Sequence, residues 1–215
     1  MIIFDSVTKR YGKRTVLEEV NLEIKPSEFV SVVGASGAGK TTLIRLLLGD
    51  EKATEGQVRM HEKDVGGLRD EELQNYRRGI GAVFQDYKLL PGKTVFENVA
   101  FTLESCDFSL ADILRLVPEA LETLSISHLR DQYPHELSGG EAQRVALARA
   151  IVHKPKMILA DEPTGNLDFE NAKQVLKQLI KLNMSGITVL LTTHNQPLVD
   201  LAGQKVVRIE GGRIV

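Results

Sequence analysis

Residues 29–42, FVSVVGASGAGKTT, contain the pattern that decides the fold. The first five residues form an apolar run, broken only by Ser31, which is typical of a central strand covered on both faces. Residues 34–41 then match G-x-x-x-x-G-K-[ST], in which small residues let successive backbone N–H groups turn toward phosphate oxygens. Residues 42–48 have helical character, and a helix beginning there adds the positive end of its dipole to the same anion. The stretch therefore predicts a strand, a phosphate-binding loop and a helix in series.

The residues expected to bind a nucleotide at this loop are Gly34, Ala35, Ser36, Gly37, Ala38, Gly39, Lys40, Thr41 and Thr42. We expect Lys40 to reach the β- and γ-phosphates and the Thr41 hydroxyl to bind Mg²⁺. The alternative, an ordinary glycine-rich turn with a solvated lysine, fits poorly because the pattern follows a buried strand and opens a helix. A phosphate loop alone predicts nucleotide binding and no particular reaction, since kinases, GTPases and motors share it.

The patterns on either side predict a mixed α/β chain. Residues 2–8 and 16–24 alternate apolar and polar side chains, as half-buried antiparallel strands do. Residues 80–84, 157–160 and 188–192 are short β-rich runs, and residues 206–215 suggest two strands around a Gly-Gly turn. An amphipathic helix is predicted from the spacing of Ala172, Val175, Leu176, Leu179 and Ile180. Residues 86–153 lack strand signals, which predicts a helical subdomain inserted into the α/β core.

The composition excludes several classes of protein. The 215 residues have a formal net charge of −2 and no run of five basic residues, so we expect no nucleic-acid partner. A single cysteine cannot form an internal disulfide, which favours a reducing compartment. No apolar stretch approaches the roughly 18 residues needed to cross a bilayer. We therefore expect a compact intracellular protein that would need a separate partner to drive any membrane process.

Two adjacent carboxylates follow the apolar run that begins at residue 157. Residues 157–162, MILADE, read as a strand that ends in Asp161 and Glu162. Because the chain turns out at the carboxyl end of a strand, both side chains can reach a ligand crevice there. Asp161 fits the Mg²⁺ role and Glu162 the general base that activates water. Alone, such a pair is more often a solvated strand end; beside a phosphate loop the catalytic interpretation is favoured.

Residues 137–141, LSGGE, which we call the signature loop, predict a second anion site in which a Ser hydroxyl and Gly-Gly amides open a helix. One chain with two phosphate-recognition loops and one carboxylate pair suggests that two chains share each nucleotide. LSGGE, with Lys40-Thr41 before it and Asp161-Glu162 after it, resembles the ATP-binding cassette (ABC) ATPase family. The resemblance covers essentially the whole chain.

That resemblance implies a P-loop NTPase (RecA-like) core with an antiparallel β subdomain and an inserted helical subdomain. Residues 1–215 would form one nucleotide-binding domain, with residues 1–85 and 154–215 as the core and residues 86–153 carrying the signature loop. It also implies further nucleotide contacts from Tyr11, which would stack on adenine, and from Gln85, Ser138, Gly139, Gly140, Asp168 and His194.

The resemblance further implies ATP hydrolysis by a head-to-tail homodimer that forms with ATP. Lys40, Gln85, Glu162 and His194 would be catalytic, and Mg²⁺ would be bound by Thr41, Gln85 and Asp161. ATP and Mg²⁺ are the expected cofactors. An integral membrane partner would dock near residues 85–101, through exposed apolar side chains that could instead fill the subdomain's own core. The chain would be cytoplasmic and peripheral on the inner face of the cell membrane.

Within the family, residues 84–86 and 94–101, FQD and TVFENVAF, resemble the cassettes of bacterial cell division. Residues 161–168, DEPTGNLD, are shared with cassettes of lipoprotein release and efflux, which remain the alternative. A cassette of DNA maintenance is disfavoured, because the span from Thr41 to Leu137 is too short for a long coiled coil. A small-molecule kinase has no use for LSGGE, and a pure binding module would not need Glu162 together with His194.

Overall fold

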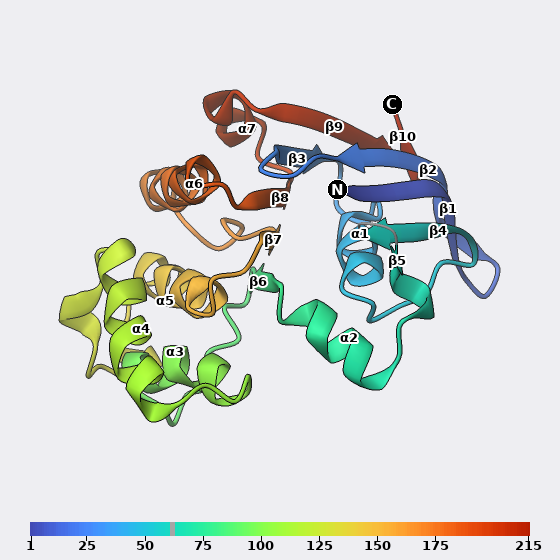
Figure 1. Cartoon of the computed structure of the whole chain (residues 1–215). Coiled ribbons are helices and arrows are strands. Elements are labelled where there is room, and N and C mark those ends of the chain that lie inside the picture. Colours follow the sequence, from blue (N-terminus) through green and yellow to red (C-terminus); the bar gives the residue numbers. More distant parts are fainter. Residues whose placement is uncertain (61–62) are drawn as a thin grey trace.

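The computed structural model describes residues 1–60 and 63–215, which form two sheets and seven α-helices (Figure 1). The four-stranded antiparallel sheet has the order β2-β1-β4-β5, with β1 (Ile2–Tyr11), β2 (Arg14–Ile24), β4 (Glu55–Met60) and β5 (Lys63–Asp64). The six-stranded sheet has the order β10-β9-β3-β8-β7-β6. Its strands are β3 (Phe29–Val33), β6 (Ile80–Phe84), β7 (Met157–Asp161), β8 (Thr188–Thr193), β9 (Lys205–Glu210) and β10 (Arg213–Ile214).

The helices are α1 (Lys40–Leu47), α2 (Asp70–Arg77), α3 (Val95–Glu104), α4 (Leu110–Thr123), α5 (Gly139–Ile151), α6 (Phe169–Met184) and α7 (Gln196–Ala202). In Figure 1, α1 and the antiparallel sheet lie on the right of the parallel strands, and α5 and α6 lie on the left. The helices α3 and α4 lie beyond α5, farther from the sheet. The six-stranded sheet is thus sandwiched between two layers.

The central strands are buried on both faces because their alternating side chains supply two separate cores. Val30 and Val32 of β3 pack with α1 and the antiparallel sheet, whereas Phe29 packs with the helical layer. In β7, Met157 and Leu159 point to the first core and Ile158 to the second. Such strands read as continuous apolar runs in sequence, since neither face meets water.

The carboxyl ends of four parallel strands meet at one edge of the sheet. The register pairs Val33 of β3 with Thr193 of β8, Thr192 with Asp161 of β7, and Asp161 with Phe84 of β6. The loops that leave these strands therefore begin side by side. In open α/β sheets this edge forms the ligand crevice.

The described secondary structure of residues 86–153 consists of α3, α4, α5 and short 3₁₀ turns, with no strand, as the sequence predicts. The helix starts are encoded locally. Thr94 and Ser138 form capping boxes with the Glu three residues later, and Ser109 accepts from the amide of Asp112. These caps satisfy backbone donors that would otherwise be unpaired.

The mixed α/β class and the two-strand ending around Gly211-Gly212 are confirmed. The sequence pattern does not predict β4 and β5, because these strands contain few apolar residues. It predicts that the first strand ends at residue 8, whereas β1 continues to Tyr11. Ile180, expected on the buried face of its helix, is only partly buried because it lies at the edge of that face. Among the residues that the structure describes, no helix combines the length and apolar character that a membrane span requires.

Candidate active site

The phosphate loop adopts a backbone shape that requires glycine at its end. Gly39 has a φ of 105° in the left-handed region, and a Cβ there would lie 2.6 Å from Leu17 Cδ2. The helix α1 follows at once, without a side-chain cap and without an acidic residue in its first turn. The amides at this helix start are therefore available to an anion, and the helix dipole favours its binding.

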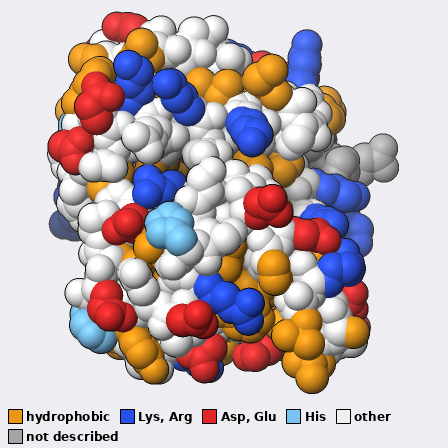
Figure 2. Space-filling model, turned by 90° about the vertical axis from the view of Figure 1, so that its left-hand side faces the viewer, with side chains coloured by type: hydrophobic (Ala, Val, Ile, Leu, Met, Phe, Trp, Pro, Cys, Tyr) orange, Lys and Arg blue, Asp and Glu red, His pale blue; other side chains and the backbone are white. Residues whose placement is uncertain are grey.

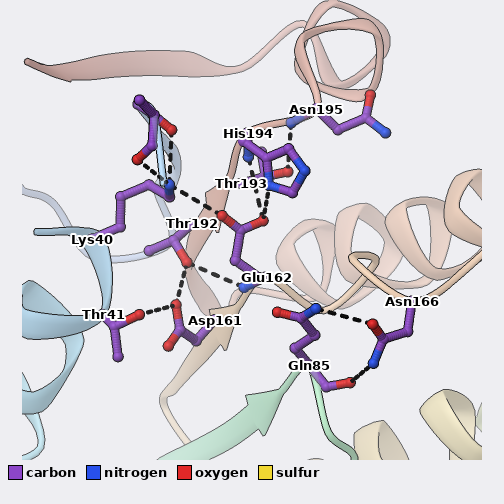
Figure 3. Close-up of polar contacts among 12 residues, drawn as sticks. Lys40, Thr41, Gln85, Asp161, Glu162, Asn166, Thr192, Thr193, His194 and Asn195 are labelled. Carbon is purple, nitrogen blue, oxygen red and sulfur yellow. Dashed lines mark hydrogen bonds and ion pairs between the residues drawn. The ribbon is translucent and has the colours of Figure 1, made fainter. Parts of the chain in front are cut away.

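The Lys40 ammonium is buried at the centre of the site, where it donates to Gly34 O at 2.8 Å and Ala35 O at 3.0 Å. It also forms an ion pair with Glu162 Oε1 at 3.1 Å. The other carboxylate oxygen, Glu162 Oε2, lies 2.9 Å from His194 Nδ1. Figure 3 shows Glu162 between the lysine and the histidine. The site thus brings together three of the four residues that the family resemblance implies to be catalytic, Lys40, Glu162 and His194.

The backbone of Glu162 has a left-handed conformation that is uncommon for a residue with a side chain. Its φ is 48°, directly after the last residue of β7. The Glu162 amide donates to Thr192 O at 3.1 Å and lies 3.2 Å from Thr192 Oγ1. Non-glycine residues in this region cost about 1–3 kcal/mol and gather at functional sites. The turn explains how Asp161, the last residue of β7, and Glu162, the residue after it, both face the same crevice.

Asp161 is buried and fixed by two hydroxyl groups. Thr192 Oγ1 donates to Asp161 Oδ1 at 2.6 Å, and Thr41 Oγ1 donates to the same oxygen at 3.3 Å. A hydroxyl and a carboxylate oxygen side by side are ligands that Mg²⁺ prefers, together with substrate phosphates and waters. The residues present therefore fit the expected Mg²⁺ site.

Gln85 follows β6 and lies on the far side of the carboxylate pair from the phosphate loop. Its side-chain nitrogen donates to Asn166 Oδ1 at 3.0 Å, and Asn166 Nδ2 donates back to Gln85 O at 3.1 Å. In Figure 3 the amide oxygen of Gln85 points away from Asn166, toward Asp161 and Glu162. Gly165 leaves room for this side chain, since a Cβ there would lie 2.8 Å from Gln85 Nε2.

A cavity of about 840 Å³ joins these residues to Tyr11. The Tyr11 hydroxyl donates to Glu51, and Lys9 Nζ lies 5.0 Å from the ring centroid. Burial and the hydrogen bond to Glu51 raise the pKa of the Tyr11 hydroxyl. The side chains and backbone that line the cavity belong to Tyr11, Arg14, Val16, Ala35, Ser36, Gly37, Gly39, Lys40, Thr41, Thr42, Arg45, Gln85, Glu162 and His194.

Most of the residues predicted from the sequence therefore meet at one cavity. Gly34 and Ala38 line an adjoining cavity that shares His194 with the first. Among the described residues, the cavity lining does not include Ser138, Gly139, Gly140 or Asp168. These four lie at the starts of α5 and α6, where Ser138 and Asp168 are the capping residues. Within one chain they are not brought to the phosphate loop.

Four polar residues of the site are not predicted as site residues from the sequence. Arg14 and Arg45 line the cavity, Thr192 fixes Asp161, and Asn166 fixes Gln85. Thr192 and Asn166 could have been suspected, because both lie within motifs next to residues that were identified. Arg14 and Arg45 carry no local signal, since a basic residue in a strand or on an exposed helix face is ordinarily solvated.

Thr192→Val should weaken both the fold and the Mg²⁺ site. Thr192 is fully buried, and its loss leaves the Asp161 carboxylate without its shortest hydrogen bond. We expect the free energy of unfolding to fall by about 1–3 kcal/mol, measured by urea titration, and the Mg²⁺ concentration for half-maximal turnover to rise. Thr188→Val is the matched control: it removes a hydroxyl that accepts from Ser27 N at the other end of β8, and should leave the Mg²⁺ dependence unchanged. An unchanged Mg²⁺ dependence in Thr192→Val would contradict this role.

Comparisons with known proteins agree with this geometry. Residues 17–165 match the ABC transporter family. The chain is 47% identical to the cell division ATP-binding protein FtsE of Mycobacterium tuberculosis, over 100% of this chain and 94% of that protein. It is 45% identical to FtsE of Bacillus subtilis, over 100% of this chain and 95% of that protein. A dimeric post-hydrolysis structure of the ATP-binding cassette MJ0796 bound to ADP and Pi superposes with a TM-score of 0.88, at 35% identity, covering 100% of this chain and 96% of that one.

The chain belongs to the ABC transporter family. It is an ATPase that uses ATP with Mg²⁺, and its fold is the P-loop NTPase fold with an antiparallel β subdomain. Its relatives of comparable length include the cell division proteins named FtsE.

Proposed function

We propose that Glu162 is the general base of ATP hydrolysis and that Lys40, Gln85 and His194 complete the catalytic group. The observation that carries this proposal is the position of Glu162, which lies in a left-handed turn at the mouth of the phosphate loop with Lys40 and His194 on its two oxygens. A general base must lie within hydrogen-bond reach of the proton that it accepts. The crevice beside Glu162 leads directly to the cavity lined by the phosphate loop.

In this proposal each residue has a distinct chemical task. Glu162 accepts the proton of the attacking water, and Lys40 with the loop amides binds the phosphate oxygens. His194 orients Glu162 and faces the γ-phosphate, while Gln85 places its amide oxygen beside the carboxylate pair. Mg²⁺, when bound by Thr41, Asp161 and Gln85, supplies positive charge that neutralises the phosphate oxygens.

Two chains would complete each site. The signature loop opens α5 with exposed Ser138 and Gly139, and neither residue lines the cavity at the phosphate loop of its own chain. Exposed residues at a helix start, where the helix dipole favours anions, fit a role in binding the nucleotide of a second chain. Asp168, which caps α6, would lie at the same interface. The dimeric form of the MJ0796 cassette supports this arrangement.

Tyr11→Ala should raise the KM for ATP by about tenfold or more, because base–aromatic stacking contributes about 1–3 kcal/mol. The ring is partly exposed beside the cavity and its hydroxyl is already bonded to Glu51. Tyr11→Phe is therefore the matched control, which keeps the ring and should keep KM within about twofold. Steady-state turnover against ATP concentration measures both. Equal effects of the two substitutions would assign Tyr11 to the Glu51 contact and not to stacking.

We further propose that the chain serves bacterial cell division together with an integral membrane partner of the FtsX kind, on the cytoplasmic face of the membrane. The support is the identity of 47% and 45% to proteins named FtsE, over nearly their full length. The surface considered for this partner lies on α3 and α4, where the hydrophobic side chains of Phe101, Leu110 and Leu114 are exposed. Figure 2, which faces this layer, shows hydrophobic side chains on its lower part.

The stretch expected to dock the partner, residues 85–101, contains both buried and exposed apolar side chains. Val95, Val99 and Ala100 are buried in the core of the helical layer, so this part of the expected groove is absent from the described surface. They are buried because they form the inner face of α3. Phe101 is 43% exposed and Phe96 and Leu89 are partly buried, which leaves a smaller apolar surface for a partner helix.

The test of the partner is capture from membranes of the organism that encodes the chain. Tagged Glu162→Gln chain with ATP serves as bait, because slow hydrolysis keeps the ATP-bound form populated. Mass spectrometry identifies what co-purifies, and bait without nucleotide is the control. A small four-span membrane protein with an outer domain is the expected result. A permease of lipoprotein release or efflux, the LolD or MacB kind of system, would contradict the cell-division assignment while leaving the ATPase roles intact.

A further inference from the structure

Arg149 is a partly buried cation on the signature helix α5 that has no role in the site described above. Its Nη1 donates to Lys88 O at 2.6 Å and its Nη2 donates to Tyr87 O at 2.8 Å. Among the described residues, it forms no ion pair with a carboxylate within 4.0 Å. Burial lowers the pKa of the guanidinium, although the group stays charged. A partly buried cation bound by backbone carbonyls, with no carboxylate partner among the described residues, is an unusual arrangement, since buried charges are ordinarily paired.

The two carbonyls that Arg149 binds belong to a strained turn just after Gln85. Tyr87 has a φ of 54° and Lys88 a φ of 49°, so two consecutive non-glycine residues adopt the left-handed conformation. Such residues persist only where the surroundings fix them. The planar guanidinium can bind both carbonyls at once, which a point charge cannot do as well. Arg149 therefore binds both carbonyls of this turn and contributes to fixing it.

The turn also contacts the opposite end of α5. A Cβ on Gly139 would lie 3.1 Å from the Tyr87 hydroxyl, which places the Tyr87 side chain against the signature loop. Gly139 opens α5, and Arg149 follows ten residues later, roughly 15 Å along the helix. Tyr87 thus lies against α5 at two points, through its carbonyl at Arg149 and through its hydroxyl at Gly139.

We propose that Arg149 is a positioning residue for ATP hydrolysis: by binding the carbonyls of Tyr87 and Lys88, it ties the helix that begins at the signature loop to the segment that places Gln85. A displacement of the signature loop then moves Arg149 and the turn with it, because α5 is one continuous helix. Gln85 also exchanges two hydrogen bonds with Asn166. Its position therefore depends both on the turn at Tyr87 and Lys88 and on Asn166. This inference rests on the proposed role of Gln85.

The first test compares Arg149→Met, Arg149→Lys and the control Arg115→Met in ATP turnover by the full chain. Arg115 is exposed on α4 and pairs with Asp112 and Glu119, so its loss should leave turnover unchanged. We expect Arg149→Met to lower kcat about tenfold or more, since misplacement of a catalytic group by about 1 Å can cost 100-fold. The KM for ATP should stay within about threefold, because the phosphate loop is untouched. Arg149→Lys should be intermediate.

A double-mutant cycle distinguishes an effect of Arg149 on the position of Gln85 from an unspecific loss of activity. In the Gln85→Ala background, Arg149→Met should lower kcat by less than about twofold, since residues that act as a unit are not additive. A full tenfold loss in both backgrounds would overturn the proposal. So would wild-type kcat in Arg149→Met while Gln85→Ala is impaired. Wild-type kcat in Gln85→Ala would instead contradict the role proposed for Gln85 itself.

Hydrogen exchange gives a readout that does not depend on activity. Peptides that contain residues 84–92 should exchange faster in Arg149→Met than in the wild-type chain, whereas peptides of α4 should not change. Urea unfolding establishes that each variant is folded. If Arg149→Met does not fold, Arg149→Lys takes its place in the cycle and in the exchange measurement. Unchanged exchange of residues 84–92 in a folded variant would overturn the proposal.

Discussion

Glu162→Gln is expected to bind ATP as the wild-type chain does and to hydrolyse it at least about 100-fold more slowly, because an amide cannot accept the proton of water. The substitution keeps the size of the side chain, so the contacts with Lys40 and His194 lose charge but not position. It also removes a negative charge beside the phosphates, which favours the ATP-bound form. Phosphate release at saturating Mg²⁺-ATP measures turnover, and equilibrium titration with ATP measures binding.

Glu122→Gln is the matched control for this prediction. Glu122 is exposed on α4, in the helical layer and away from the cavity, and its loss should leave both turnover and binding unchanged. Unchanged turnover in Glu162→Gln would remove the general-base assignment, whereas a loss of ATP binding would show that Glu162 acts mainly in forming the pocket.

Lys40→Met is expected to weaken ATP binding by roughly 100-fold or more. The Lys40 side chain is 6% exposed, and its ammonium makes three contacts within 3.1 Å, which hold it at the phosphate loop. Charge-assisted hydrogen bonds to phosphate contribute about 1.5–3 kcal/mol each, and 1.4 kcal/mol corresponds to a factor of ten. Calorimetric titration with ATP measures the change in Kd.

Folding must be separated from binding in this variant, since removal of one partner of a buried pair leaves Glu162 uncompensated. Urea unfolding of Lys40→Met provides this check. Lys177→Met, on the exposed side of α6, is the control and should retain wild-type affinity. A folded Lys40→Met chain with wild-type affinity for ATP would mean that the loop amides bind the phosphates without help from the lysine.

The parallel strands and the phosphate loop could be predicted because their physics is local. Residues 29–33 are apolar except for Ser31, and residues 157–160 are apolar throughout; that pattern arises where both faces of a strand are covered. Gly39 is required because its φ lies in the left-handed region and because a Cβ there would clash with Leu17. A glycine in the sequence can therefore indicate such a position directly. The position of Asp161 and Glu162 could be predicted for the same reason, since they come at the end of a strand that faces the crevice.

The remaining features depend on contacts between distant segments. Thr192 reads as an ordinary strand residue until β8 is placed beside β7, where its hydroxyl meets Asp161. Arg149 reads as a polar residue of an amphipathic helix until the turn at Tyr87 is placed against it. The burial of Val95 and Val99 likewise follows from packing against α5, which the spacing of residues 94–101 alone does not fix.

The signature loop of one chain is expected to complete the site at the phosphate loop of another, and sedimentation equilibrium of the Glu162→Gln chain measures this association. With Mg²⁺-ATP the mass should be that of two chains, and without nucleotide that of one. Adding Ser138→Arg to the same chain should abolish the ATP-dependent doubling while ATP still binds to the cavity, because Ser138 lies outside the lining of its own site. A single-chain mass with Mg²⁺-ATP, or loss of ATP binding in the Ser138→Arg variant, would contradict the account.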